Sequence, residues 1–401
     1  MTEELPLAGI RVLDAATYIA APVAAGILGE FGAEVLKIEK PGVGDPLRKF
    51  GSPSGRPDGT LNWMNDARNR RSITLDLRKP KGAELFKRLV ADADVVIENF
   101  RPDTMEKWGL GWEALHAVNR RMVMLRLTAY GQTGPMRDRV GFARMAHAMG
   151  GIGYLAGNPG EPPVNPGPAS LADYITAVYG ALGVLLALRA RDRSGIGQYI
   201  DLALYEAVFR SLDETLPAYA KHGKIRQPTG SLTSNAAPNA NYPTKDGKYA
   251  SISCTDDKMF GRIVTAMGRS ELIDDPRWAT NAARLKIRPE VEKLVSDWTK
   301  TLTRAELVKI CDENEVPCGA ILSIEDIYAD PHYQARKMFT RLVDPEAGEI
   351  VLPSPVPKLS RTPGRVTRVG PKLGDANDDV YRGQLGLSDA DIAALKDDGV
   401  I

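Results

Sequence analysis

The chain has 401 residues, of which 43% are apolar and 26% charged, and its formal net charge is +1. This composition is typical of a globular protein with a large buried core, and the balanced charge excludes a strong electrostatic pull toward nucleic acid or an anionic membrane. The start, MTEELPLAGI, does not have the pattern of a signal peptide, and the longest apolar run, around 181–188, is too short to span a bilayer, so we expect a cytoplasmic protein without nucleic-acid or membrane partners.

Strand-like and helical patterns alternate through the first half of the chain. A strand ending at Asp14 precedes a helical pattern over 21–33, and a second strand is predicted at 34–40. Further strands are predicted at 70–77, 93–100 and 121–131, with an amphipathic helix over 79–93. Residues 200–223 are predicted to be helical, and mixed strand and helical patterns follow up to about residue 325.

This order predicts an α/β protein built on a Rossmann-like, open and mostly parallel sheet, with a smaller α+β domain. We assign the large domain to 1–205 and 330–401, the small domain to 225–325, and linkers to 206–224 and 326–345. Ligands bind beyond the carboxyl ends of the strands in such sheets. Lys40, residues 99–101 and residues 128–130 follow three of these ends, so a binding site is expected there.

Familiar cofactor and triad motifs are missing from the sequence. No GxGxxG follows a strand, and neither GxxxxGK[ST] nor GxSxG occurs. The four histidines (His116, His147, His222 and His332) are not paired at metal-ligand spacing, so no metal site is expected. The three cysteines, Cys254, Cys311 and Cys318, form no CxxC and are expected to be buried or half-buried thiols.

The stretch PASLADYITAVYGALG, residues 168–183, places one carboxylate, Asp173, at the start of an apolar helical pattern. Ser170 and Asp173 fit a capping box, in which the acid would simply start the helix. A carboxylate can also be a covalent nucleophile, and the small residues that follow it would let a ligand or another backbone come close. The residues by themselves leave both roles open.

From end to end, the chain resembles the family III CoA-transferases, the formyl-CoA and carnitine CoA-transferase group. The resemblance is carried, in order, by LAGIRVLDAATYIAAPVAAGILGEFGAEVLKIEKPGVGDPLR, NRRSITLDLRKPKGAELFKRLVADADVVIENFRP, LTAYGQTGP, ASLADYITAVYGALGVLLAL, GIGQYIDLALYEAV, APNANYPTKDGKYASIS, VPCGAILSIEDIYADPHYQAR and LGLSDADIAALKDDGVI. It implies that Asp173 is the catalytic nucleophile, which takes CoA from an acyl-CoA donor as an aspartyl-CoA thioester and passes it to a carboxylic acid by ping-pong exchange.

The resemblance also implies which residues contact CoA, which is a substrate here, so no bound cofactor is expected. Lys40, Asn99, Phe100 and Lys107 match CoA-contacting positions, and Arg71 and Tyr130 are weaker matches. It further implies an interlocked homodimer.

Two departures argue against formate or oxalate as the acceptor. Ile19 replaces a glutamine of formyl-CoA transferase, and GSLTSNAAPNANYP replaces its glycine-rich loop. A dicarboxylate such as succinate, malate or mesaconate is plausible, with Arg144 or Arg126 as candidates to bind its distal carboxylate.

Two other functions stay open. The α-methylacyl-CoA racemases share this pattern but carry a histidine where this chain has Phe142, which cannot take up a proton. His147 lies five residues further on and would need a different geometry. A CoA-binding subunit without catalysis is the second alternative, and it predicts loss of the aspartate that this chain retains as Asp173.

Overall fold

The computed structural model describes residues 4–401, so the first three residues of the predicted large domain lie outside the described residues. The described chain folds as two compact units. Unit 1 runs to Gly153 and also contains Asn165–Ile225 and Gln334–Ile401, whereas unit 2 comprises Tyr154–Val164 and Arg226–Tyr333. The domain and linker boundaries expected from the sequence stay a prediction.

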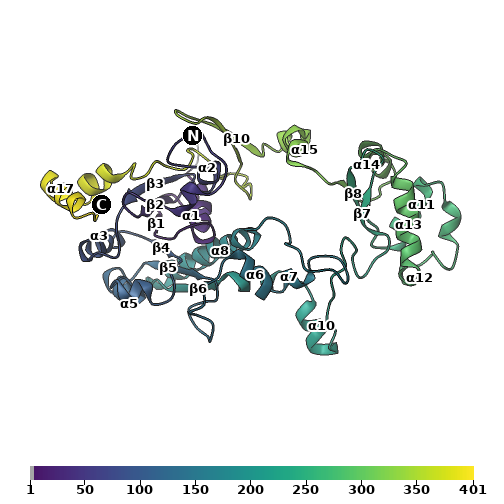
Figure 1. Cartoon of the computed structure of the whole chain (residues 1–401), viewed down its shortest axis with the longest axis horizontal. Coiled ribbons are helices and arrows are strands. Elements are labelled where there is room, and N and C mark those ends of the chain that lie inside the picture. The colour runs from purple at the N-terminus through teal and green to yellow at the C-terminus, as the bar shows by residue number, and fades with distance from the viewer. Residues whose placement is uncertain (1–3) are drawn as a thin grey trace. The chain divides into compact units, whose positions relative to one another are not determined.

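A six-stranded parallel sheet forms the centre of unit 1 (Figure 1). Its strands are β1 (Arg11–Asp14), β2 (Glu34–Glu39), β3 (Arg70–Thr74), β4 (Val95–Glu98), β5 (Val123–Thr128) and β6 (Tyr199–Ala203). Their order, β3-β2-β1-β4-β5-β6, is that of a Rossmann-type doubly wound sheet. The predicted parallel α/β sheet is therefore confirmed, and the strand order reverses direction between β1 and β4, where such sheets bind ligands.

Side chains alternate between two apolar cores, one on each face of the sheet. Val95 and Ile97 of β4 face a core formed with α1 (Ala20–Glu30), α8 (Leu171–Ser194) and α9 (Leu204–Arg210). Val96, between them, faces the opposite core, to which α3 (Pro80–Val90), α5 (Trp112–Val118) and α17 (Asp389–Asp397) contribute. Burial on both faces explains why these strands are continuous apolar runs in the sequence.

Small residues allow α8 to lie directly against α1 and β5. A Cβ atom at Gly180 would come within 3.1 Å of Leu125 and 3.3 Å of Ala24, so only glycine fits this contact without a shift. The close approach fixes the start of α8, and with it Asp173, beside the start of α1. The close packing expected from the small residues of this helix is confirmed.

Helix α8 is longer than its apolar sequence run suggested. Its most apolar 18-residue window has a mean hydropathy of 1.8, so by length and composition alone the helix is able to cross a membrane. The expectation that every apolar stretch is too short was wrong, because it considered 181–188 while the helix runs over 24 residues. A core helix passes the same test, and 44% of this window is buried inside the protein.

The segment predicted as one helix over 200–223 has a different structure. It begins with β6, pairs with β5 in parallel, and then forms α9 and α10 (Thr215–His222). The prediction failed because β6 is an edge strand whose residues are mostly half-exposed or exposed, so its apolar residues fit a helical spacing equally well.

The C-terminal segment of unit 1 packs against β3. Ala376 N–H donates to the Ser72 carbonyl and Asp76 N–H donates to the Val400 carbonyl, at 2.8 Å each. The remaining elements of this unit are η1 (Pro46–Lys49), α2 (Leu61–Asp66), α4 (Thr104–Lys107), α6 (Ala143–Met149), the antiparallel pair β10 (Phe339–Asp344) and β11 (Gly348–Pro353), and η3 (Asp379–Gln384).

Unit 2 is built on an antiparallel sheet with the order β7-β8-β9, and has its own apolar core. Cys254 and Cys311 are buried in it and Cys318 is half-buried, as predicted. Its elements are β7 (Asn239–Pro243), β8 (Tyr249–Ser253), α11 (Asp257–Ala266), η2 (Ser270–Ile273), α12 (Asn281–Lys286), α13 (Arg288–Thr299), α14 (Arg304–Glu313), β9 (Cys318–Ala320) and α15 (Ile324–Ala329). The short helices α7 (Ile152–Leu155) and α16 (Pro331–Ala335) lie where the chain passes between units.

Candidate active site

Two cavities open at the carboxyl edge of the parallel sheet, and Thr17 lines both of them. Thr17 belongs to the loop between β1 and α1, directly beside the point where the strand order reverses. One cavity has a volume of about 280 Å³ and the other of about 420 Å³. A long ligand that crosses Thr17 would occupy both.

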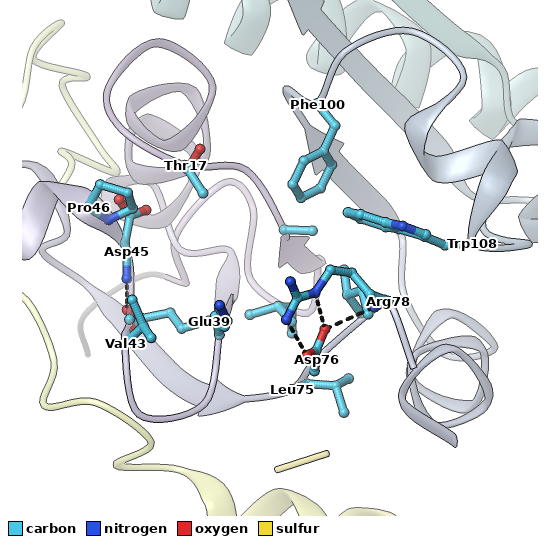
Figure 2. A pocket seen from close by; sticks show the side chains of 15 residues that line it. Thr17, Glu39, Val43, Asp45, Pro46, Leu75, Asp76, Arg78, Phe100 and Trp108 are labelled. Atoms are coloured by element: carbon cyan, nitrogen blue, oxygen red, sulfur yellow. Dashed lines mark hydrogen bonds and ion pairs between the residues drawn. The ribbon is translucent and has the colours of Figure 1, made fainter. Parts of the chain in front are cut away.

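The first cavity combines an aromatic wall with charged groups (Figure 2). The rings of Phe100 and Trp108 meet edge to face at 5.0 Å between centroids, across the cavity from Asp45. Lys40, exposed and directly following β2, is a cation of the lining. Arg78 also lines the cavity, but its guanidinium is held by the Asp76 carboxylate at 2.6 and 2.8 Å.

The second cavity contains Asp173, in the first turn of α8. Its walls come from the β1–α1 loop, the ends of β4 and β5, and the starts of α6 and α8. Its lining side chains are those of Thr17, Tyr18, Ile19, Ala20, Phe50, Asn99, Leu127, Thr128, Ala129, Phe142, Ala143, Arg144, Ala169, Ser170, Asp173 and Leu204.

Asp173 does not serve as a helix cap. Within residues 4–401 the Ser170 side chain makes no capping hydrogen bond, and the capping box that the sequence suggested is not formed. His147 of α6 takes this role instead, because its Nε2 accepts the Ala172 N–H at 3.0 Å. The amide that a capping residue normally satisfies is thus bonded from a neighbouring helix, and the Asp173 carboxylate is left to face the cavity.

Burial and a neighbouring acid make the Asp173 carboxylate unusually basic. Desolvation raises its pKa from 3.8 to about 7, and the charge of Asp66 adds to the rise. Asp66 is itself buried, which raises its pKa, and it accepts a hydrogen bond of 2.9 Å from the Tyr174 hydroxyl. A weakly hydrated carboxylate of raised pKa is a better nucleophile than one in water.

The β1–α1 loop is fixed by side chains from three other strands and loops. Asn99 accepts the Thr17 N–H at 2.8 Å and donates to the Thr17 carbonyl at 2.7 Å. Asp45 accepts the Tyr18 N–H at 3.1 Å, and the buried Lys37 ammonium donates to the Ala16 carbonyl. These bonds hold Tyr18 at a φ of +64°, a left-handed conformation that is unfavourable for a residue with a side chain.

The predicted site residues line the first cavity, line the second cavity, or lie outside both. Lys40 and Phe100 line the first cavity, and Asn99 and Asp173 line the second, so the structure brings these four together around Thr17.

Lys107 is exposed on α4 next to Trp108, and the Tyr130 ring lies beside Gly141, so both are near the cavities without lining them. Arg71 lies in a separate cavity with Arg11 and Asn69 at the amino ends of the strands, where it pairs with Asp379 at 2.6 Å. The CoA contacts assigned to these residues stay predictions.

Two residues bear on the racemase alternative. Phe142 is 59% exposed and lines the Asp173 cavity, where it meets Tyr18 edge to face. His147 is buried, and its Nε2 is occupied by the Ala172 amide. Burial also lowers the pKa of His147. Among the described residues that line this cavity there is no histidine to pair with Asp173, which disfavours proton shuttling across an α-carbon.

Sequence reasoning missed several residues of the site. No sequence pattern marks Trp108 apart from its position next to Lys107. Thr17 and Tyr18 follow the predicted strand that ends at Asp14, and their position after a strand end was the available indication. Tyr174 directly follows Asp173 and was a recognisable candidate. Asp66 lies in the short helix α2, far from Asp173 in sequence, and no local pattern marks it.

Comparison with known proteins gives consistent matches over nearly the whole chain. A family model described as CoA-transferase family III matches residues 7–377. The chain is 51% identical over 402 residues to the succinyl-CoA–L-malate CoA-transferase beta subunit of Chloroflexus aurantiacus, covering 100% of this chain and 99% of that protein. It is 36% identical over 376 residues to the succinate–glutarate CoA-transferase of Agrobacterium fabrum, covering 92% and 93%. A solved CAIB/BAIF family protein from Brucella suis superposes with a TM-score of 0.85 at 34% identity, covering 96% of this chain and all of that one (100%).

Proposed function

This chain belongs to CoA-transferase family III, and we propose that it moves CoA from a dicarboxylic acyl-CoA donor to a dicarboxylic acid acceptor through a covalent intermediate on Asp173. The observation that carries the proposal is a desolvated carboxylate that does not cap its helix and instead faces a cavity at the carboxyl edge of the sheet. The names of the relatives, which join succinyl-CoA with L-malate and succinate with glutarate, support the substrate class.

In the first half-reaction, an Asp173 oxygen attacks the thioester carbonyl of the donor and the C–S bond breaks. The products are a mixed anhydride on Asp173 and CoA thiolate. The thiolate then attacks the aspartyl carbonyl, which releases the donor's carboxylate and leaves an aspartyl-CoA thioester. Desolvation of Asp173 favours the first step, because the charged form gives up little hydration when it attacks.

The second half-reaction runs the same steps in reverse order with a new acid. The acceptor carboxylate attacks the aspartyl-CoA carbonyl, giving a new mixed anhydride and CoA thiolate. The thiolate attacks the acceptor's carbonyl, forms the product acyl-CoA and restores the Asp173 carboxylate. The free energy of the thioester is kept in covalent bonds throughout, provided that water, which would hydrolyse the anhydride, stays out of the cavity.

The CoA moiety has a fitting environment in the first cavity. Phe100 and Trp108 offer a stacking surface for adenine, and Lys40 is a cation for its phosphates. The pantetheine arm would then pass Thr17, the residue common to both cavities, to place its sulfur near Asp173. In this arrangement Asn99 acts mainly through the Thr17 loop that it holds.

The test is a transfer assay with purified protein. Succinyl-CoA is offered with L-malate, glutarate or mesaconate, and the new acyl-CoA is quantified by mass spectrometry. Asp173→Asn, which keeps the side-chain shape, should lower kcat/KM by more than about 1,000-fold. Hydroxylamine added with succinyl-CoA should leave a hydroxamate on the Asp173 peptide of the wild type. A racemase would exchange the α-proton of its substrate without labelling Asp173, and a non-catalytic subunit would bind CoA with neither result.

We also propose that the chain forms a homodimer. Support comes from the outward face of α8, where large apolar residues recur at helical spacing and are 37–62% exposed: Tyr174, Val178, Leu182, Leu185 and Leu186. Contiguous apolar exposure of this kind marks a protein interface. Light scattering should give a dimer mass for the wild type and a smaller mass for Leu186→Lys. Because the 51% identical relative is named as a beta subunit, a monomeric protein without activity would instead favour a heteromer.

A further inference from the structure

The charges that line the Asp173 cavity are unusually few. Among the described lining residues there is one carboxylate, Asp173, and one cation, Arg144. Most of the other lining side chains are apolar or very small, such as Ala20, Ala129 and Leu204. A second carboxylate group on a substrate would therefore have one cation of this lining to pair with, Arg144.

Arg144 is free to meet such a group. It is exposed at the start of α6, and within residues 4–401 it forms neither an ion pair nor a side-chain hydrogen bond. It is also not paired with Asp173, since the groups that shift the pKa of Asp173 include no cation. The two charges thus line one cavity without neutralising each other.

Arg126, the other cation considered from the sequence, has a different role. It is only 8% exposed and is bonded to Glu98 at 2.9 Å and to Glu106 at 2.8 Å. It does not line the Asp173 cavity. A substrate carboxylate would have to displace two protein carboxylates to reach it, so Arg126 is a structural residue of β5.

The start of α6 is positioned against the start of α8. His147 accepts the Ala172 N–H, and Ala172 immediately precedes Asp173. Arg144 lies three residues before His147, so both side chains leave α6 on the same face, one turn apart. The His147–Ala172 bond therefore sets the separation between the Arg144 and Asp173 backbones. A ligand with two charged ends would have to match this separation to reach both side chains.

We propose that Arg144 binds the distal carboxylate of the substrate, while the proximal carboxyl group reacts at Asp173. This inference rests on the proposed CoA transfer. In a ping-pong exchange with one nucleophile, the donor acyl group and the acceptor occupy the same cavity in turn. One guanidinium therefore selects two-ended acids in both half-reactions, whereas a monocarboxylate leaves it without a partner. The Ser170 hydroxyl, which also lines the cavity and caps no helix amide, is available to the same ligand.

The experiment compares succinate with butyrate, which has the same number of carbons but one charged end. Wild type, Arg144→Gln, Arg144→Lys and Arg139→Gln are assayed with each acid as acceptor and glutaryl-CoA as donor, so that succinyl-CoA and butyryl-CoA are both distinguishable from the donor. Arg139 is a matched control, because it is exposed in the same segment but does not line the cavity. Loss of a charge-assisted contact predicts that kcat/KM for succinate falls about 10- to 100-fold in Arg144→Gln. The value for butyrate should change less than about threefold, Arg144→Lys should recover part of the loss, and Arg139→Gln should match wild type.

Where butyrate turns over too slowly to measure, the inhibition constants of both acids against transfer to L-malate replace kcat/KM. The inference is overturned if Arg144→Gln weakens succinate and butyrate equally, or if it weakens neither. Failure of the proposed function has a different signature, namely no transfer and no hydroxamate on Asp173 in the wild type. Labelling of Asp173 by succinyl-CoA in wild type, together with equal losses in the variant, would keep the transferase mechanism and remove Arg144 from it.

Discussion

Replacing Asp173 with asparagine should make the protein more stable in neutral and alkaline solution while abolishing its activity. Burial and the charge of Asp66 raise the Asp173 pKa from 3.8 to about 7 in the folded protein. Well below pH 4 the carboxyl is protonated in both the folded and the unfolded states, so the shift has no effect on stability. As pH rises, the unfolded state ionises first, and the folded state loses stability until its own carboxyl ionises near pH 7.

The magnitude follows from the size of the shift. At about 1.4 kcal/mol per pKa unit, the ionised carboxylate costs the folded state about 4 kcal/mol above pH 7, but only about 1.5 kcal/mol at pH 5. Asparagine does not titrate. The free energy of unfolding of Asp173→Asn, relative to wild type, should therefore be about 2.5 kcal/mol higher at pH 8.5 than at pH 5.

Urea denaturation followed by circular dichroism, at fixed protein concentration and several pH values, measures this difference. Asp397→Asn, at an exposed position of α17, shows the effect of simply removing a surface charge. A pH-independent difference between wild type and Asp173→Asn would refute the reasoning, because it would mean that the carboxylate is well solvated or paired in the folded protein.

Three further changes test other parts of the site. Asp66→Asn removes a charge that raises the Asp173 pKa, so the midpoint of the pH dependence of kcat/KM, expected near 7 in wild type, should move down; an unchanged midpoint would show that the Asp66 charge does not affect Asp173. His147→Leu leaves the Ala172 amide unsatisfied and should lower stability by about 1–3 kcal/mol in urea denaturation, with partial recovery in His147→Gln; equal losses in both variants would point to packing instead. Lys37→Met leaves the buried Asp45 carboxylate without its cation and Asp14 with Arg70 alone, and it should cost about 3–5 kcal/mol by the same measurement; a loss below about 1 kcal/mol would show that the remaining partners suffice.

Local sequence patterns predicted the elements that are buried on both sides. The strands ending at Asp14, Glu39, Glu98 and Thr128 were correctly placed, because continuous apolar runs between helical patterns have few other structures. The edge strand β6 was missed. It pairs with a single strand and is only partly buried, so its apolar residues show a weak alternation that also fits a helix. The resemblance to a known family, more than any periodicity, singled out Asp173.

The contacts around Asp173 were not predictable in the same way. The sequence suggested that Ser170 and Asp173 cap α8, whereas a histidine from α6 does so. Asp66 acts on Asp173 from α2, and Asn99 holds Thr17 across the boundary between β1 and β4. Each of these relations depends on which strands become neighbours, and a reversal of strand order is a property of the whole sheet that no local pattern encodes.

Two features that oppose folding lie at this edge of the sheet. Tyr18 has a left-handed backbone and Asp173 is desolvated, whereas the amide at the start of α8 is satisfied by His147. Each of the first two costs the folded state about 1 kcal/mol or more. Asn99 and Lys37 compensate by fixing Thr17 and Ala16, the two residues before Tyr18, and they do so from the end of β4 and from β2. Tyr18 and Asp173 line the same cavity, so the network that holds the strained loop also maintains the surroundings of the desolvated carboxylate.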